Sequence, residues 1–337
     1  MGERPIVIAH RGASGYRPEH TRASYELAIA MGVDFIEPDL VPTKDGVLIV
    51  RHENEISETT DVASHLEFAD RRTTKRIEGR EVAGWFTEDF TLAEIRTLRA
   101  KERLPFRDAS WNDRFEVPTL SEVLELARRK SAGTGRTIGV YPETKHPTYF
   151  RSIGLPLEET LVETLHAAGY QGRSAPVYLQ SFETGNLKAL RGKTDLPLIQ
   201  LLDVEGGPYD LHGDLPKGGR TYREMATPSG LAEIAAYADG IGPNKRLIVP
   251  ARPDGRLDAA TSLVDDAHRA GLLVHPWTFR SEERFLSPDY EGKPGREYEQ
   301  FFALGVDGVF SDFPDVALRT RDAGRQLAEE WKARRNR

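Results

Sequence analysis

Two carboxylates stand close together in the segment Glu37-Pro38-Asp39, at the end of a short apolar stretch. Residues i and i+2 of a β-strand point to the same face, and the strand rise places their Cα atoms about 6.7 Å apart. Two like charges aimed at one place are unfavourable unless a cation lies between them. Because hard oxygen ligands suit Ca²⁺ and Mg²⁺, the spacing indicates a divalent-cation site, with a pair of surface carboxylates as the alternative.

Two histidines each end an apolar run. His10 follows Ile6–Ala9, and His52 follows Val47–Arg51. An imidazole titrates near neutrality, so two of them on opposite sides of a scissile bond can act as base and acid. Two hydrogen-bonded structural histidines are the alternative.

Two cations accompany these groups. Arg11 follows the first histidine directly, and Lys145 stands two residues after Glu143. Arginine can hold a phosphate through two parallel hydrogen bonds, whereas ion pairing with Glu37, Asp39 or Glu143 is the alternative. A cation site, paired histidines and a basic clamp together favour phosphodiester cleavage. Glycoside hydrolysis would leave the histidines idle, and sugar isomerisation has less use for Arg11.

The elements that must position these residues alternate along the chain. Short apolar runs alternate with stretches of helical spacing, which predicts a parallel sheet. Nine strands are expected, at Pro5–His10, Phe35–Leu40, Val47–His52, Thr137–Pro142, Val177–Ser181, Leu196–Leu202, Gly240–Gly242, Leu272–Trp277 and Gly308–Ser311. An eight-stranded α/β barrel needs one fewer, and we expect the weak segment near Gly240 to be the one that is not a strand.

Helical spacing predicts the connections, and polar residues end the strands. Helices are expected at Glu19–Met31, Leu120–Arg129, Leu157–Ala168, Thr184–Arg191, Gly230–Ala238, Leu257–Ala270 and Arg296–Leu304, with a charged helix from Arg319. In a (β/α)₈ barrel the active site lies at the carboxyl ends of the strands. Each candidate above ends or follows a predicted strand, as do Gln180, Trp277 and Asp312.

One stretch breaks this rhythm. Residues 53–113 are rich in charge and have few strand signals. About 60 residues are too many for a plain connection in a compact domain. We therefore expect an inserted loop or subdomain within a single domain that covers residues 1–337.

Composition excludes several functions. The 337 residues carry a net charge of −7, so a broad nucleic-acid surface is not expected. There is no cysteine, which excludes disulfides, a thiolate nucleophile and cysteine-ligated metals. No Walker or G-x-G-x-x-G motif supports a nucleotide cofactor.

No apolar run approaches the ~18 residues of a membrane span. The first strand begins too early for a signal peptide, so we expect a cytoplasmic protein if Met1 is the native start, and an exported one if a signal has been removed.

Several motifs give the sequence a family resemblance. Residues 10–21, HRGASGYRPEHT, closely resemble the opening of glycerophosphodiester phosphodiesterases. Further matches follow in family order at 37–46 (EPDLVPTKDG), His52, 141–145 (YPETK), 178–182 (YLQSF), 238–243 (ADGIGP), 274–278 (VHPWT) and 310–315 (FSDFPD). The resemblance covers nearly the whole chain, and the long segment after His52 matches the insertion that this family carries.

The resemblance implies a TIM barrel and a set of site residues. It implies a metal held by Glu37, Asp39 and Glu143, acid–base catalysis by His10 and His52, and phosphate contacts from Arg11 and Lys145. Likeness to the larger bacterial members favours Ca²⁺ over Mg²⁺. Trp277 is a candidate for the apolar wall of the glycerol pocket, with packing at the barrel rim as the alternative, and Gln180 is placed in the same pocket.

The expected activity is metal-dependent hydrolysis of glycerophosphodiesters, such as glycerophosphocholine or glycerophosphoethanolamine, to sn-glycerol 3-phosphate and an alcohol. A lysophospholipase D-like enzyme on the same barrel is the alternative, and it would need an apolar groove. The 53–113 segment holds Trp85, Phe86 and Phe90, but its charge argues against such a groove. A non-catalytic binding protein is a third hypothesis. We expect a small-molecule substrate and neither nucleic acid, a stable membrane anchor nor a protein partner.

Overall fold

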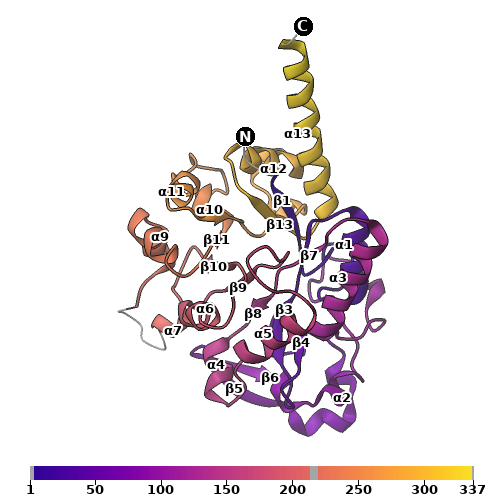
Figure 1. Ribbon diagram of the computed structural model, residues 1–337. Helices are drawn as coiled ribbons and strands as arrows, with labels where there is room; N and C mark the ends of the chain where they lie inside the picture. The colour runs from indigo at the N-terminus through magenta and orange to yellow at the C-terminus, as the bar shows by residue number, and fades with distance from the viewer. Residues whose placement is uncertain (1–3, 213–218, 336–337) are drawn as a thin grey trace.

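Parallel strands form the centre of the computed structural model and helices surround them (Figure 1). The structure describes residues 4–212 and 219–335. The strands join in the orders β13-β1-β2-β7 and β12-β11-β10-β9-β8-β3-β4. Their bounds are β1 Ile6–His10, β2 Phe35–Glu37, β3 Asp39–Pro42, β4 Leu48–Val50, β7 Gly139–Val140, β8 Glu143–Thr144, β9 Leu179–Ser181, β10 Leu198–Leu202, β11 Gly240–Pro243, β12 Leu273–Val274 and β13 Gly308–Ser311.

Prolines interrupt two strands of the central sheet. Pro38 separates β2 from β3, and Pro142 separates β7 from β8; proline has no N–H to donate to a ladder. The ladder nevertheless continues, because Glu143 N donates to the Pro38 carbonyl and Gln180 N to the Pro142 carbonyl, each at 2.9 Å. Each interrupted pair therefore acts as one barrel strand.

The strands close into a barrel, because β13 joins β1 on one side and the segment after β12 on the other. β1 pairs in parallel with β13, and just beyond β12 the Pro276 carbonyl accepts a hydrogen bond of 3.0 Å from Phe310 N. Phe279 then bridges Ser311 in parallel. The fold is the TIM (β/α)₈ barrel that the sequence predicts.

Of the nine predicted strands, the one that lies outside the barrel is not the one that we expected. The segment near Gly240 forms barrel strand β11, whereas Val47–His52 contributes β4, which pairs antiparallel with β3 outside the barrel. The turn between β3 and β4 contains Gly46 at φ 77°. Glycine lowers the strand signal near residue 240, but it is needed there: a Cβ on Gly240 would lie 2.7 Å from the Ile199 side chain.

Helices and short helical turns cover the outside of the barrel (Figure 1). They are α1 Arg22–Met31, α3 Leu120–Thr134, α4 Pro147–Ser152, α5 Glu158–Ala167, α6 Thr184–Arg191, α7 Tyr209–His212, α8 Tyr222–Met225, α9 Pro228–Ile234, α10 Lys245–Ile248, α11 Leu263–Arg269, α12 Pro294–Ala303 and α13 Pro314–Arg335. α1 begins later than predicted because Thr21 caps it through Ser24 N at 3.1 Å. α13 begins earlier, at Pro314, since proline suits the first helical position. None of the helices in the two described ranges is long and apolar enough to cross a membrane.

Residues 53–113 form a hairpin and short helical turns beside the barrel (Figure 1). The hairpin pairs β5 (Thr73–Ile77) with β6 (Arg80–Gly84). The turns are Val62–Ser64, Leu66–Arg71, Thr87–Asp89, α2 Leu92–Ile95 and Ala109–Trp111. Trp85, Phe86 and Phe90 are buried, so they hold this segment together and do not offer an apolar surface.

The barrel interior is solid beneath the carboxyl ends of its strands. Ile8, Tyr141, Ile199 and Phe310 form a buried inner cluster, against which Trp277 packs. The rings of Tyr141 and Phe310 meet edge to face at 4.9 Å. This packing leaves the polar residues at the strand ends as the floor of any site above it.

Candidate active site

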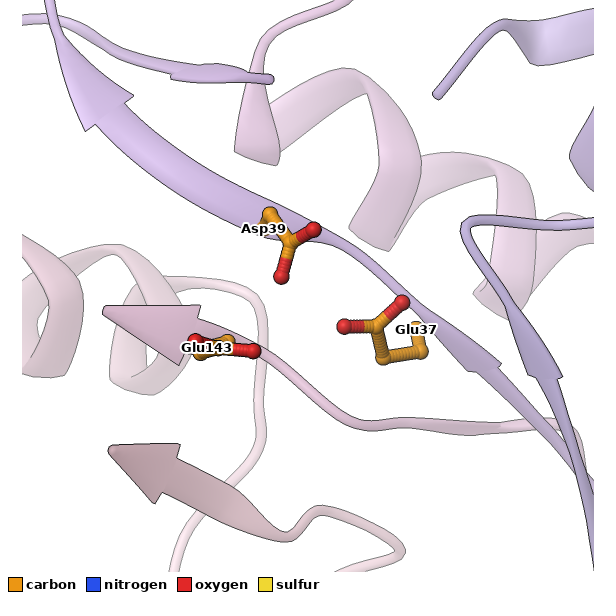
Figure 2. A group of neighbouring side chains, drawn as sticks. All are labelled: Glu37, Asp39 and Glu143. Carbon is orange, nitrogen blue, oxygen red and sulfur yellow. The ribbon is translucent and has the colours of Figure 1, made fainter. Parts of the chain in front are cut away.

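Three carboxylates converge at the carboxyl ends of neighbouring barrel strands (Figure 2). Glu37 ends β2, Asp39 begins β3 and Glu143 begins β8. One oxygen from each lies within 4.8 Å of the others, and all three residues are buried. The sequence predicted this set, and the adjacent register of Asp39 and Glu143 explains how β3 and β8 bring it together.

The hydrogen bonds around the carboxylates leave room for a cation. Glu37 accepts from Arg11 N at 2.7 Å and from Gln180 Nε2 at 3.2 Å. His20 Nε2 donates to Asp39 Oδ2 at 2.8 Å, but the buried Asp39 Oδ1 has no partner. Since a buried unpaired carboxylate oxygen is costly, this atom fits a metal ligand, and the acidic triad could hold a divalent ion.

The pKa values of the three carboxyl groups also favour a bound cation at the triad. Burial raises the pKa of Glu143 to about 8, and burial together with Asp39 raises that of Glu37. Burial would also raise the pKa of Asp39, but Lys145, His20 and His52 together outweigh it and hold that pKa well below its usual range. Concentrated negative charge therefore favours uptake of a proton or a metal ion here.

The two predicted phosphate ligands are paired with carboxylates. Arg11 Nη1 donates to both oxygens of Glu19 at 3.1 and 3.0 Å, and Lys145 Nζ donates to Glu143 Oε1 at 2.7 Å. Arg11 Nε also lies 3.4 Å from Asp39 Oδ2, so the ion pairing that the sequence left open is present for both cations. Arg11 and Lys145 also line the cavity above the triad, so both remain within the site.

A carboxylate holds each of the two predicted acid–base histidines. His10 Nδ1 donates to Asp312 at 2.6 Å, and His52 Nδ1 lies 2.9 Å from Glu53 Oε1. Burial lowers the pKa of His10 to about 4 and that of His52 to about 3. Both imidazoles are then neutral at pH 7. A carboxylate at Nδ1 requires the proton there, which leaves Nε2 as an acceptor.

A cavity of about 470 Å³ joins these groups. Of the sequence-predicted residues, those that line it are His10, Arg11, Glu37, His52, Glu143, Lys145, Gln180 and Trp277. Trp277 also packs edge to face on Phe182 at 5.7 Å and donates from Nε1 to the Gly242 carbonyl at 2.7 Å. It therefore combines the two roles that the sequence left as alternatives, a cavity wall and a packed rim residue.

Sequence reasoning missed residues that hold the site together. Asp312, noted only as a strand-end residue, also accepts from Arg107 Nη2 at 2.6 Å and Arg280 Nε at 2.9 Å. His20 lies in a motif already singled out, so its position was available. Arg107 lies in the 53–113 segment and had no local signal, because its partner is 205 residues away in the chain.

Comparison with known proteins identifies the family. The model of the glycerophosphoryl diester phosphodiesterase family matches residues 10–316. The chain belongs to this family. It is 40% identical over 323 residues to a glycerophosphodiester phosphodiesterase of Arabidopsis thaliana, covering 92% of this chain and 84% of that one. It is 32% identical over 337 residues to the glycerophosphodiester phosphodiesterase of Haemophilus influenzae, covering 93% and 88%.

Solved structures share the fold. A glycerophosphodiester phosphodiesterase from Agrobacterium tumefaciens superposes with a TM-score of 0.59 at 20% identity, covering 93% of this chain and 98% of that one. A phosphodiesterase from Oleispira antarctica gives 0.62 at 21% identity, covering 94% and 97%. These likenesses show the fold, whereas the family match and the two relatives at 32–40% identity show that the chain is a phosphodiesterase.

Proposed function

We propose that the enzyme hydrolyses glycerophosphodiesters such as glycerophosphocholine and glycerophosphoethanolamine to sn-glycerol 3-phosphate and an alcohol. The observation that carries this proposal is a cluster of three buried carboxylates, two of which line one cavity together with the imidazoles of His10 and His52. The Oleispira antarctica neighbour is in complex with the product sn-glycerol-3-phosphate, which supports the same product here.

Glu37, Asp39 and Glu143 would hold one divalent ion, for which the family resemblance favours Ca²⁺ over Mg²⁺. When bound, such an ion supplies Lewis acidity and neutralises phosphate charge. Arg11 and Lys145 are buried cations at the same cavity. Burial would lower the pKa of Lys145, but Glu143 and Asp39 outweigh it and raise that pKa above its usual value. Both residues stay charged and can stabilise a phosphoryl group.

His10 and His52 are the proposed acid–base pair. One neutral imidazole takes the proton of the nucleophile at Nε2. The other, protonated once the anionic phosphodiester is bound beside it, donates a proton from Nε2 to the leaving alkoxide. Because both start neutral and each holds its Nδ1 proton against a carboxylate, either ring is prepared for either step.

Removing either imidazole tests this pair. His10→Ala and His52→Ala should each lower kcat by at least about a hundred-fold, the usual scale for acid–base groups. Turnover of glycerophosphocholine, followed by coupled detection of sn-glycerol 3-phosphate, measures the loss. Near-normal turnover in either variant would remove that histidine from the mechanism.

The metal requirement is tested on stripped protein. We expect turnover of glycerophosphocholine to stop with EDTA and to return with Ca²⁺, and with Mg²⁺ to a smaller extent. Full turnover in EDTA would contradict the metal role. Release of choline from lysophosphatidylcholine, with none from glycerophosphocholine, would instead support the lysophospholipase D-like alternative, although Trp85, Phe86 and Phe90 are buried and provide no groove for an acyl chain.

A further inference from the structure

Beyond the proposed acid–base pair, a chain of close contacts between histidines and carboxylates runs outward from His52. His52 Nδ1 lies 2.9 Å from Glu53 Oε1, and Glu53 Oε2 accepts from His146 Nε2 at 2.8 Å. His146 Nδ1 then donates to Glu78 Oε1 at 2.7 Å. All four residues line the cavity.

The members of this chain come from three separate places in the fold. His52 and Glu53 follow β4, and His146 stands between β8 and α4. Glu78 lies in the tight turn of the β5–β6 hairpin, within the 53–113 segment. Figure 1 shows this hairpin near α4, and the hydrogen bond between Glu78 and His146 joins the two, so the segment reaches the cavity at this point.

The charge state of His146 follows from its partners. Carboxylates only accept hydrogen bonds, so a ring bonded to one at each nitrogen carries both protons. Burial lowers the pKa of His146, but the hydrogen bonds that it donates to Glu53 and Glu78 outweigh burial and raise that pKa to about 10. His146 is thus a fixed cation between two anions, which holds Glu53 in one orientation.

A fixed Glu53 defines the state of His52. Its Oε1 keeps the proton of His52 on Nδ1, and the ring is turned so that Nε2 is the free acceptor. Without His146, the Glu53 side chain, which is 46% exposed, could rotate into solvent. Neither Glu78 nor His146 needs to touch the substrate for this effect.

We propose that Glu53, His146 and Glu78 are positioning residues that orient His52 and select its tautomer, and that the β5–β6 hairpin supplies the outermost of them. This inference rests on the proposed function, since it gives His52 a catalytic role. It assigns the hairpin a part in catalysis through His146.

The test uses His146→Gln and Glu78→Gln in the full-length, Ca²⁺-loaded enzyme. Each should lower kcat for glycerophosphocholine by about ten- to a hundred-fold, the usual effect of removing a group that orients another active-site side chain, while KM changes by less than about two-fold. The double variant should be no slower than the slower single variant, because the residues act as one unit. Glu81→Gln, an exposed site on the same hairpin, should keep wild-type kcat.

A second readout does not depend on activity. Nitrogen-15 NMR of the histidine rings, assigned with His52→Ala, should give a neutral Nδ1–H tautomer for His52 and a doubly protonated ring for His146. In Glu78→Gln and His146→Gln the His52 signal should shift toward a mixture of tautomers. Circular dichroism establishes whether each variant is folded. If His146→Gln does not fold, the test is made with Glu78→Gln alone.

The outcomes separate this inference from the proposed function. If His52→Ala is inactive while both variants keep wild-type kcat and an unchanged His52 signal, the positioning role is overturned and the catalytic role stands. If His52→Ala itself turns over normally, the proposed catalytic role fails. Slower turnover with an unchanged His52 tautomer would also overturn the inference, since the loss would then have another cause.

Discussion

Neighbouring residues hold the proposed site residues in place through hydrogen bonds. His10 is held by Asp312, and Glu37 by the backbone N–H of Arg11. Arg11 adopts φ 59°, which is uncommon outside glycine and turns its amide toward that carboxylate. Such contacts fix the site before substrate arrives, so that single substitutions act on orientation as well as on chemistry.

At the residue scale, Asp39 offers a test of the acidic triad. Asp39→Asn keeps the shape of the side chain but removes one of three charges, so Ca²⁺ affinity should fall by at least about ten-fold. Isothermal titration calorimetry on metal-stripped protein measures the change. Asp265→Asn, exposed on α11, is the matched control. Unchanged Ca²⁺ affinity in Asp39→Asn would show that the triad is not the binding site.

At the scale of elements, arginines of the 53–113 segment form ion pairs with buried carboxylates of the barrel. Arg107 donates to Asp312 at 2.6 Å, to Glu282 at 2.8 Å and to the Ser14 carbonyl at 3.0 Å. Arg103 donates to Glu19 at 3.0 Å, and Glu19 in turn pairs with Arg11. The segment is thus connected to both the His10 side and the Arg11 side of the site.

Arg107→Met tests this connection. The variant leaves the buried Asp312 with one guanidinium partner in place of two, which should lower the free energy of unfolding by about 2–3 kcal/mol. Arg107→Lys keeps the charge but loses the planar fork, so its loss should be smaller. Urea denaturation measures both, with Arg128→Met on the exposed face of α3 as control. Equal stability of Arg107→Met and the wild type would mean that Arg280 alone satisfies Asp312.

At the scale of the whole molecule, His146 couples folding to pH. Its pKa is 6.5 in the unfolded chain and about 10 in the folded protein, where the hydrogen bonds that it donates to Glu53 and Glu78 outweigh burial. A raised folded pKa means that the folded state binds the proton more tightly. The resulting stabilisation is fully present below about pH 6.5 and is lost as the pH rises toward 10.

The wild type should therefore lose stability relative to His146→Gln as the pH rises from 6.5 to 10. Free energies of unfolding of both proteins at pH 6, 8 and 10 measure the difference, because other titrating groups affect the two proteins alike. A difference that stays constant over this range would mean that His146 does not carry the raised pKa.

Much of the fold and site could be predicted from local patterns. Apolar runs that alternate with helical spacing predicted the barrel, and the carboxyl ends of parallel strands converge, so polar residues at strand ends had to meet. Glu37, Asp39 and Glu143 meet for this reason. The fold could therefore be predicted from the hydrophobic periodicity of short segments and from the order in which strands and helices alternate.

Other features were decided only by tertiary packing. β4 and β11 exchanged their expected places because pairing depends on neighbours that a segment does not contain, such as Ile199 beside Gly240. Likewise, nothing near Arg107, Glu78 or His146 in the chain indicates its partners. Their contacts arise because the 53–113 segment folds back onto the barrel, and a charge buried there is stable only where an opposite charge from a distant segment meets it.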